Sequence, residues 1–429
     1  MGITSSQLAA VPSVIAALAF TVVAVALVSD TGFGDASSLR RTGIALTTLA
    51  AAWFSVAGFS PRLARFNNVA LVNVLLTLLG AELLLRFMVD RLPVSVVQML
   101  PAATRSPMLR DRGLFTVDAL QGSGQLFSWR PGLVIAGQKW VTIDRNGYRN
   151  ASVPTATDVV LLGDSVTLAQ FVRQDMASLL QQRGIPTLNL GFSAYGPNQE
   201  RDAYRKYVIE PQIAHRLVVV NFCGCNDVEN AQVYREVAAR GGTWTDYLAS
   251  EGTAFPFAFT PPWTVSILFN MPSALKRAWQ YRQTHPPLAL TLRRGTVHVT
   301  GWLPRRPLGD ADWEPALAAV ADIATLARSA GARLIIAYYP DSAALYLDGL
   351  ARYPVLHHAA ARDWSDATTR LRRLADDVGA RFLDYTPDLQ RAIGDRAVVT
   401  TEGDYHPNQE GVQIMVEALL PLVGDPASR

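Results

Sequence analysis

The chain has few lysines and no cluster of basic residues. Of its 429 residues only three are lysine, Lys139, Lys206 and Lys276, and the more numerous arginines are scattered along the sequence. The formal net charge at pH 7 is only +3. Because nucleic-acid surfaces are built from clustered basic side chains, this distribution predicts a protein without a nucleic-acid partner.

Cysteine is also scarce. The two cysteines, Cys223 and Cys225, are separated by one residue. This pair cannot supply the four ligands of a structural zinc site, and redox pairs usually have two intervening residues. On an extended strand the two side chains share a face but lie too far apart to bond unless the chain bends at Gly224. We therefore expect two partly buried free thiols; the alternative is a disulfide formed in an oxidising compartment.

Motifs for metals and phosphates are missing as well. Among the six histidines, His357 and His358 form a pair, but no spaced carboxylates or cysteines accompany them. The segment Gln121-Gly122-Ser123-Gly124 lacks the preceding strand and the Lys-Ser/Thr of a phosphate loop. We expect neither a metal nor a cofactor.

What the chain has in excess is apolar residues, which make up 49% of it against 17% charged residues. Three apolar stretches near the N-terminus, roughly residues 8–28, 43–59 and 69–89, approach the ~17–25 residues that cross a bilayer as a helix. The first has no basic leader and no clear cleavage site, which favours a retained anchor over a signal peptide. The sequence therefore predicts a membrane anchor of about three transmembrane helices over residues 1–91, with the lipid bilayer as a partner.

After a linker over residues 92–132, short apolar runs alternate with amphipathic stretches. A strand entering an Asn-Gly turn is predicted over Trp140–Arg149. The predicted buried strands are Val159–Leu162, Thr187–Leu190, Leu217–Phe222, Arg333–Tyr339 and Arg381–Tyr385. The predicted helices are Val166–Arg183, Asn198–Ile209, Trp313–Ala330, Trp364–Val378 and Gln409–Leu420. This alternation predicts an α/β domain over residues 133–429, with a parallel sheet covered by helices on both faces.

One stretch breaks the alternation, from about residue 238 to residue 308. It is rich in aromatic residues and proline, and Thr264–Arg282 within it could form an amphipathic helix. A lid over a site, a face resting on a bilayer and a contact for another subunit all fit this composition. The sequence leaves these three alternatives open.

Two segments carry the chemistry. Ser165 follows an apolar strand in Gly163-Asp164-Ser165, which places its hydroxyl at the carboxyl edge of the sheet. Near the C-terminus, Asp404 stands two residues before His406. A serine hydroxyl needs a base and a group that orients the base before it becomes a good nucleophile. Together these residues predict serine-based acyl chemistry.

Two further loops follow strands that end at the same edge. One is the glycine-containing loop Gly191–Gly196, and the other is Gly224-Cys225-Asn226-Asp227. A loop N–H and the Asn226 amide could point at one oxygen, and such donors contribute roughly 3–4 kcal/mol each to acyl transfer. Both loops could equally be ordinary polar turns.

Gly163-Asp164-Ser165, the Gly191–Gly196 loop, Gly224-x-Asn226-Asp227 and Asp404-x-His406-Pro407-Asn408 resemble, in order, the four blocks of the SGNH/GDSL hydrolase superfamily. Asn146-Gly147-Tyr148-Arg149 is similar to a lead-in found in bacterial envelope members. The resemblance implies a flavodoxin-like three-layer fold and esterase, lipase, deacetylase or O-acyltransferase activity. It also implies that Ser165 is the nucleophile, that His406 is the general base and that Asp404 orients His406.

The same resemblance assigns the oxyanion hole to the N–H of Ser165, the N–H of Ala194 and the side chain of Asn226. The sequence departs from the family here, because Ala194 stands where a glycine usually donates; we expect alanine to be tolerated if its φ is negative, with Gly191 as the fallback donor. Ala169 also stands where a glycine is common. Asp404 lies two residues before His406, whereas many members have three.

We therefore expect a membrane-anchored serine esterase or O-acyltransferase that acts on an acylated envelope glycan or lipid. The alternative is a catalytically idle SGNH domain that serves as a subunit of a larger membrane-protein complex. Arginines flanking the apolar stretches slightly favour a cytoplasmic C-terminal domain. The resemblance implies the opposite side, and we follow it: the bacterial inner membrane, with the domain outside the cytoplasm.

Overall fold

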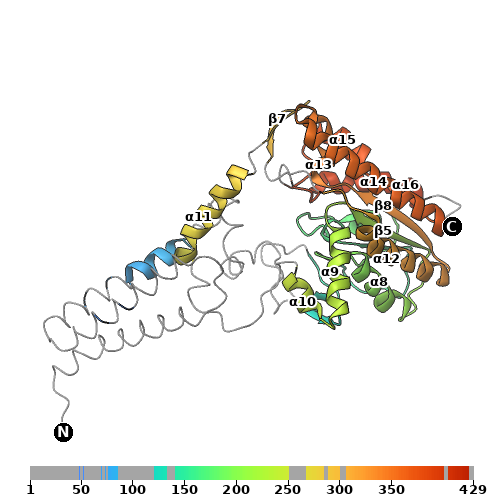
Figure 1. The fold of residues 1–429 in the computed structure, drawn as a ribbon. Coiled ribbons are helices and arrows are strands. Elements are labelled where there is room, and N and C mark those ends of the chain that lie inside the picture. Colours follow the sequence, from blue (N-terminus) through green and yellow to red (C-terminus); the bar gives the residue numbers. More distant parts are fainter. Residues whose placement is uncertain are drawn as a thin grey trace, which may run out of the picture. The chain divides into compact units, whose positions relative to one another are not determined.

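The computed structural model describes the chain in segments (Figure 1). The described residues are 76–85, 120–132, 141–250, 267–284, 288–299, 306–400 and 404–424, together with Thr48, Ala52, Val69 and Asn73. The chain divides into two compact units, one of Met1–Leu92 with Ser266–Phe269 and one of Pro93–Val265 with Asn270–Arg429.

In the first unit, the described residues 76–85 are helical and lie in the third predicted apolar stretch. Most of the three predicted spans lies outside the described residues. Within the described part of the chain, no helix combines the length and the apolar character needed to cross a bilayer. The predicted anchor over residues 1–91 and the linker over residues 92–132 stay predictions.

The second unit is built around a five-stranded sheet of order β4-β3-β5-β8-β9, in which every neighbouring pair is parallel. The strands are β3 (Val159–Gly163), β4 (Thr187–Asn189), β5 (Leu217–Cys223), β8 (Arg333–Tyr339) and β9 (Arg381–Asp384). All five begin where the sequence predicts a strand, and their ends differ from the prediction by at most one residue. The predicted α/β fold with a parallel central sheet is confirmed.

Helices cover both faces of this sheet, which is why β3 and β5 are buried at every position. Side chains alternate along a strand, so Val160 and Leu162 pack into one core while Val159 and Leu161 pack into the other. The first core includes residues of α8 (Pro197–Tyr204), α9 (Asp227–Ala239), α12 (Asp310–Ser329) and α14 (Pro354–Val378). The second includes residues of α7 (Met176–Gln182), α15 (Thr386–Ile393) and α16 (Gln409–Val423).

The predicted single helix Val166–Arg183 is wrong. The structure has a short helix, α6 (Ser165–Leu168), and a separate α7. Helix α6 ends at Ala169, whose φ of 48° and ψ of 44° lie in the left-handed region and cannot continue a helix. Helix α7 then starts anew, with the Asp175 carboxylate capping the N–H of Ser178.

Other helices differ from the prediction in their bounds. The predicted Asn198–Ile209 divides into α8 and a π-helical turn, η4 (Arg205–Ile209). Helices α12 and α16 follow their predictions closely, while α14 begins ten residues earlier than predicted, at Pro354 instead of Trp364, and includes His357 and His358. Helices α9, α13 (Ser342–Leu345) and α15 and the 3₁₀ turn η6 (Leu347–Arg352) were not predicted.

The aromatic stretch over residues 238–308 contains regular elements where it is described. They are α10 (Trp244–Ser250), α11 (Ile267–Thr284) and an antiparallel hairpin of β6 (Leu288–Leu292) and β7 (Gly295–Val299). A second hairpin, β1 (Leu120–Ser123) with β2 (Leu126–Trp129), precedes the sheet. The turn predicted at Asn146-Gly147 is present, with Gly147 at a φ of 87°, but Ile143 pairs with Arg149 only as an isolated bridge instead of forming the predicted strand.

Candidate active site

Ser165 lies at the carboxyl edge of the sheet as the first residue of α6. Strand β3 ends at Gly163, and a Cβ there would lie 2.1 Å from Oγ1 of Thr167, so only glycine fits. Asp164 follows, and its Oδ1 accepts the N–H of Val166 at 2.8 Å, which caps the helix. This turn fixes the Ser165 side chain, which is 6% exposed.

The structure brings Ser165, His406 and Asp404 into one hydrogen-bonded line. Oγ of Ser165 is 3.0 Å from Nε2 of His406, and Nδ1 of His406 is 3.0 Å from Oδ1 of Asp404. Residues 241 positions apart in sequence therefore meet at hydrogen-bond distance. These are the distances at which a base can take a proton from a nucleophile and a carboxylate can hold that base in one tautomer.

Asp404 is held in its charged form. Burial raises the pKa of its carboxyl, but hydrogen bonds and charge from His406 and a hydrogen bond from Thr400 outweigh this effect, so the pKa lies below its usual value. The hydroxyl of Thr400 donates to Oδ2 at 2.9 Å, and the N–H of Tyr405 donates to Oδ1 at 2.7 Å. A carboxylate so held can stabilise a positively charged His406.

Aromatic rings flank His406, and the sequence did not single them out. Tyr405 stacks on its ring at 4.3 Å between centroids and an interplanar angle of 29°. Phe171 meets it edge-on at 5.5 Å and is itself 39% exposed. Phe171 lies in the loop between α6 and α7, the segment that was predicted as helix. The helix break at Ala169 thus places a side chain against the catalytic candidate.

Arg149 of the lead-in segment holds the loop between α6 and α7 by hydrogen bonds. Its guanidinium is buried and donates to the carbonyls of Leu168, Ala169, Val172 and Arg173. Arginine can satisfy several carbonyls at once through its planar set of donors. The lead-in therefore has a structural role, which is to hold the loop that carries Phe171.

The structure corrects the expectation for Ala194. Its φ is +61°, in the left-handed region, so the condition of a negative φ is not met. This conformation costs an alanine roughly 1–2 kcal/mol relative to the right-handed one. The carbonyl of Ala194 accepts the Tyr247 hydroxyl at 2.6 Å, a contact that helps to hold the loop in place. Ala194 therefore adopts a glycine-like conformation while keeping a methyl group.

The N–H of Gly191, the fallback donor, is already engaged in the structure. Its N–H already donates to Oδ1 of Asn189 at 2.8 Å, so it is not available to a developing oxyanion. A Cβ at Gly191 would lie 2.7 Å from side-chain atoms of Thr167 and 2.8 Å from the Leu168 nitrogen. Glycine is needed here for the close packing of two loops. Among the described residues, none accepts the N–H of Ser165, the N–H of Ala194 or the side-chain N–H₂ of Asn226.

The expectation of free thiols is also wrong. Cys223 and Cys225 are joined by a disulfide, with their Cα atoms 5.1 Å apart. Strand β5 ends at Cys223 and the chain turns at Gly224, which supplies the bend that an extended segment lacks. The disulfide lies inside the site: Sγ of Cys225 is 3.0 Å from Oδ1 of Asn226 and 3.7 Å from Oδ2 of Asp164. In the described part of the chain, these sulfurs and Asp164 form the one cluster of metal-ligand types, and sulfurs bonded to each other are not thiolate ligands.

Asp164, next to Ser165, belongs to a group of three fully buried carboxyls with Glu200 and Asp227. Burial raises the pKa of each, and the charge of Asp164 adds to the effect at Glu200 and Asp227. Oδ2 of Asp227 accepts the N–H of Cys223 at 2.7 Å, whereas neither oxygen of Glu200 has a hydrogen-bond partner among the described residues. Burial and the mutual repulsion of like charges both favour the neutral forms of these carboxyls.

Comparison with solved structures finds GDSL-like lipases, acylhydrolases and acetylxylan esterases. A GDSL-like lipase from Bacteroides thetaiotaomicron is 15% identical over 62% of this chain and 88% of its own, with a TM-score of 0.30. An acetylxylan esterase from Geobacillus stearothermophilus is 12% identical over 65% of this chain and 98% of its own, with a TM-score of 0.34. Neither a protein-family model nor a curated protein matches the chain. The chemistry below rests on the geometry of Ser165, His406 and Asp404.

Proposed function

We propose that this protein is a serine-dependent ester hydrolase or O-acyltransferase. The observation that carries the proposal is the hydrogen-bonded line from Oγ of Ser165 through His406 to Asp404, with 3.0 Å at each step. An ordered Ser-His-Asp line at a sheet edge meets the geometric requirement for nucleophilic acyl transfer.

In the proposed reaction, Oγ of Ser165 attacks the carbonyl carbon of the ester while its proton passes to Nε2 of His406. The carbonyl oxygen becomes an oxyanion, and the negative Asp404 stabilises the imidazolium. When the tetrahedral intermediate collapses, the ester C–O bond breaks and His406 returns the proton to the departing alcohol, leaving an acyl-serine. Water or a sugar hydroxyl then attacks the acyl-serine by the same steps in reverse.

The developing oxyanion needs hydrogen-bond donors, and we assign the N–H of Ser165, the N–H of Ala194 and the side chain of Asn226 to this role. Their lack of acceptors among the described residues supports the assignment. The contact between Oδ1 of Asn226 and the sulfur of Cys225 supports it further, since it turns the Nδ2 end of the amide away from the disulfide. Each such donor contributes about 3–4 kcal/mol in acyl transfer.

We extend the proposal to the setting of the reaction. The apolar stretches over residues 1–91 support a membrane-anchored enzyme whose substrate is an acylated envelope glycan or lipid outside the cytoplasm. A disulfide in the active-site loop supports an oxidising compartment. A reporter enzyme fused after Arg429 tests the side: activity only in the cytoplasm would reverse this part of the proposal.

The catalytic part is tested with the full chain purified in mild detergent. Wild type should hydrolyse p-nitrophenyl acetate, and Ser165→Ala and His406→Ala should lose about 10⁴-fold or more of kcat. A folded wild type without turnover that co-purifies with membrane proteins at fixed stoichiometry would refute the proposal in favour of an idle assembly subunit. Ser178→Ala, on α7 outside the line, is the matched serine control.

A further inference from the structure

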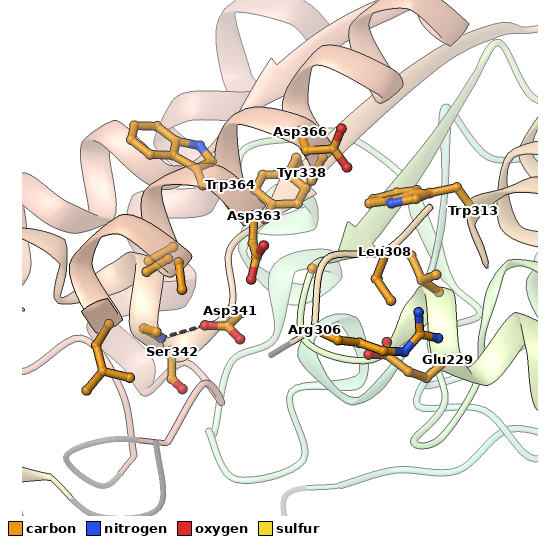
Figure 2. A pocket seen from close by; sticks show the side chains of 18 residues that line it. Glu229, Arg306, Leu308, Trp313, Tyr338, Asp341, Ser342, Asp363, Trp364 and Asp366 are labelled. Atoms are coloured by element: carbon orange, nitrogen blue, oxygen red, sulfur yellow. Dashed lines mark hydrogen bonds between the residues drawn. The ribbon is translucent and has the colours of Figure 1, made fainter. Parts of the chain in front are cut away.

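A cavity of about 140 Å³ lies at the same edge of the sheet as the candidate triad (Figure 2). Gly224, just after β5, and Tyr338, near the end of β8, form part of its wall. Asp341, which directly follows β8, forms another part. In α/β sheets ligands bind beyond the carboxyl ends of the strands, so this cavity is at the expected place for a substrate subsite.

The chain turn at Gly224 lines the cavity and also lies close to Ser165. Gly224 lies between the two bonded cysteines, and the sulfur of Cys225 is 3.7 Å from Oδ2 of Asp164, which in turn is 3.4 Å from Oγ of Ser165. A Cβ at Gly224 would lie only 2.3 Å from the Tyr338 hydroxyl, so glycine keeps this wall thin. One turn of the chain therefore separates the cavity from the nucleophile's surroundings.

The lining combines aromatic rings with carboxylates. The aromatic residues are Tyr338, Trp313 and Trp364, and the carboxylates belong to Glu229, Asp341, Asp363 and Asp366. Figure 2 shows Asp341, Asp363 and Trp313 flanking the same space. Carboxylates accept hydrogen bonds from hydroxyl groups, and ring surfaces pack against C–H groups. A sugar ring presents both kinds of group.

Other ligand classes fit this lining less well. An acyl chain would strip water from the carboxylates without giving them hydrogen-bond donors, which is costly. An anion would face four carboxylates and a single cation, Arg306, which already binds Asp312 through two hydrogen bonds of 2.8 and 2.9 Å. The lining therefore favours a neutral ligand rich in hydroxyl groups.

A buried donor in the wall provides a second, independent observation. Trp313 is 4% exposed, its ring stacks on Phe222 at 5.7 Å, and its Nε1–H has no acceptor among the described residues. Buried indole N–H groups normally have a partner. Because Nε1 is fully enclosed, a small shift of the cavity wall is needed before a ligand hydroxyl can accept this N–H.

We propose that this cavity binds a neutral sugar unit of the glycan whose ester is attacked by Ser165. The inference rests on the proposed function and narrows its substrate from "glycan or lipid" to a glycan. The cavity then sets the position of the polysaccharide chain relative to the nucleophile, while the ester itself lies on the other side of the Gly224 turn.

Binding is tested with Ser165→Ala, which binds without turnover, titrated with neutral, unacylated oligosaccharides and followed by tryptophan fluorescence and calorimetry. Into this background we place Asp363→Asn or Arg362→Gln. Both changes break the same surface ion pair, in which the two residues lie 2.7 Å apart, but only Asp363 lines the cavity. We expect Asp363→Asn to weaken binding about tenfold, as the loss of a charge-assisted hydrogen bond does, and Arg362→Gln to bind like its parent.

In the active enzyme, Asp363→Asn should lower kcat/KM for an O-acetylated oligosaccharide about tenfold relative to that for p-nitrophenyl acetate. Trp313→Phe, which keeps a ring and removes the N–H, should shift the same ratio in the same direction. Saturable sugar binding that neither substitution weakens would overturn the proposal, and so would binding of fatty acid in preference to sugar. An enzyme that turns over no ester refutes the proposed function alone, because the sugar titration uses the inactive variant.

Discussion

Asp164 and Asp404 both belong to the surroundings of Ser165, Asp164 by direct contact and Asp404 through His406. Their environments shift their carboxyl pKa values in opposite directions. Asp404 is one-third exposed and accepts hydrogen bonds from His406, Thr400 and Tyr405, and its pKa is lowered. Asp164 is fully buried near two further buried carboxyls, and its pKa is raised. Carboxyl pairs whose environments separate their pKa values commonly mark different chemical roles.

The difference bears on which group receives the proton of Ser165. Oγ of Ser165 is 3.0 Å from Nε2 of His406 and 3.4 Å from Oδ2 of Asp164. His406 is the nearer of the two acceptors, and Asp404 holds its ring in place. The charged Asp404 at the other end then favours the imidazolium that forms. We infer that His406 receives the proton and that Asp404 stays charged during turnover.

The largest expected effect comes from removing the charge on the exposed side. Asp404→Asn should lower kcat for p-nitrophenyl acetate by about 10⁴-fold, because the amide holds His406 in the wrong tautomer and cannot stabilise its positive charge. Thr400→Val, which removes only one hydrogen bond to Asp404, should cost no more than about tenfold. Equal losses in the two variants would mean that the loop, rather than the charge of Asp404, matters.

Replacing a buried carboxyl should change the free energy of unfolding. A carboxyl with a raised folded pKa stabilises the fold at low pH, and this contribution is lost as the pH rises through that pKa. Glu200→Gln should therefore have a higher free energy of unfolding than wild type at about pH 8, by about 1–3 kcal/mol, and the difference should shrink near pH 4. Glu210→Gln, at an exposed position, is the matched control.

Asp404 should behave in the opposite way. Its lowered pKa stabilises the fold above the usual carboxyl range, and this contribution is lost as the pH falls through the lowered value. Thermal unfolding of Asp404→Asn compared with wild type should show its largest deficit near neutral pH and a smaller one in acid. If the stability differences of Glu200→Gln and Asp404→Asn follow the same pH trend, the contrast between buried carboxyls with raised pKa values and Asp404 with a lowered one is wrong.

The disulfide contacts both the buried Asp164 and Asn226 of the proposed oxyanion hole through the sulfur of Cys225. Reduction by a dithiol, or the double change Cys223→Ser and Cys225→Ser, removes the S–S bond that fixes the turn before Asn226. We expect kcat to fall about tenfold with little change in KM, since only the transition state uses the amide. In an Asn226→Ala background the same double change should have almost no further effect. Independent, additive losses would mean that the disulfide acts elsewhere.

The smallest effect is expected at Ala194. Ala194→Gly should raise the free energy of unfolding by about 1 kcal/mol, because glycine adopts a positive φ without strain, and it should leave the N–H in place. Ala318→Gly, at an exposed position in α12, should lower stability by about the same amount. A destabilised Ala194→Gly would show that the methyl group makes contacts that outweigh its backbone strain.

Apolar runs predicted the central strands to within a residue, because a strand buried on both faces has a near-continuous apolar sequence. Ser165, His406 and Asp404 were recognised by the strand end and by the Asp-x-His spacing, and the structure brings them together. The helix break at Ala169 was not predicted, since alanine is the best helix former and its left-handed conformation is imposed by the carbonyl contacts of Arg149.

The surroundings of the triad were also harder to predict, because they depend on contacts between residues that are distant in sequence. Asp164 and Glu200 come from separate elements, and nothing in either local sequence indicates that both are fully buried. The disulfide required knowledge of how sharply the chain bends at Gly224. Helix α9 was missed because polar and apolar residues alternate irregularly along it, and the polar Asp227 and Asn230 occupy buried positions, so no clear apolar stripe marks its inner face.

The most direct test of the account is covalent labelling of the full-length protein with a fluorophosphonate, followed by peptide mass spectrometry. The account predicts one adduct, on Ser165, that forms in wild type, is lost in Ser165→Ala and slows strongly in His406→Ala. A well-folded wild type that takes up no label, or that carries it on another serine, would contradict the account.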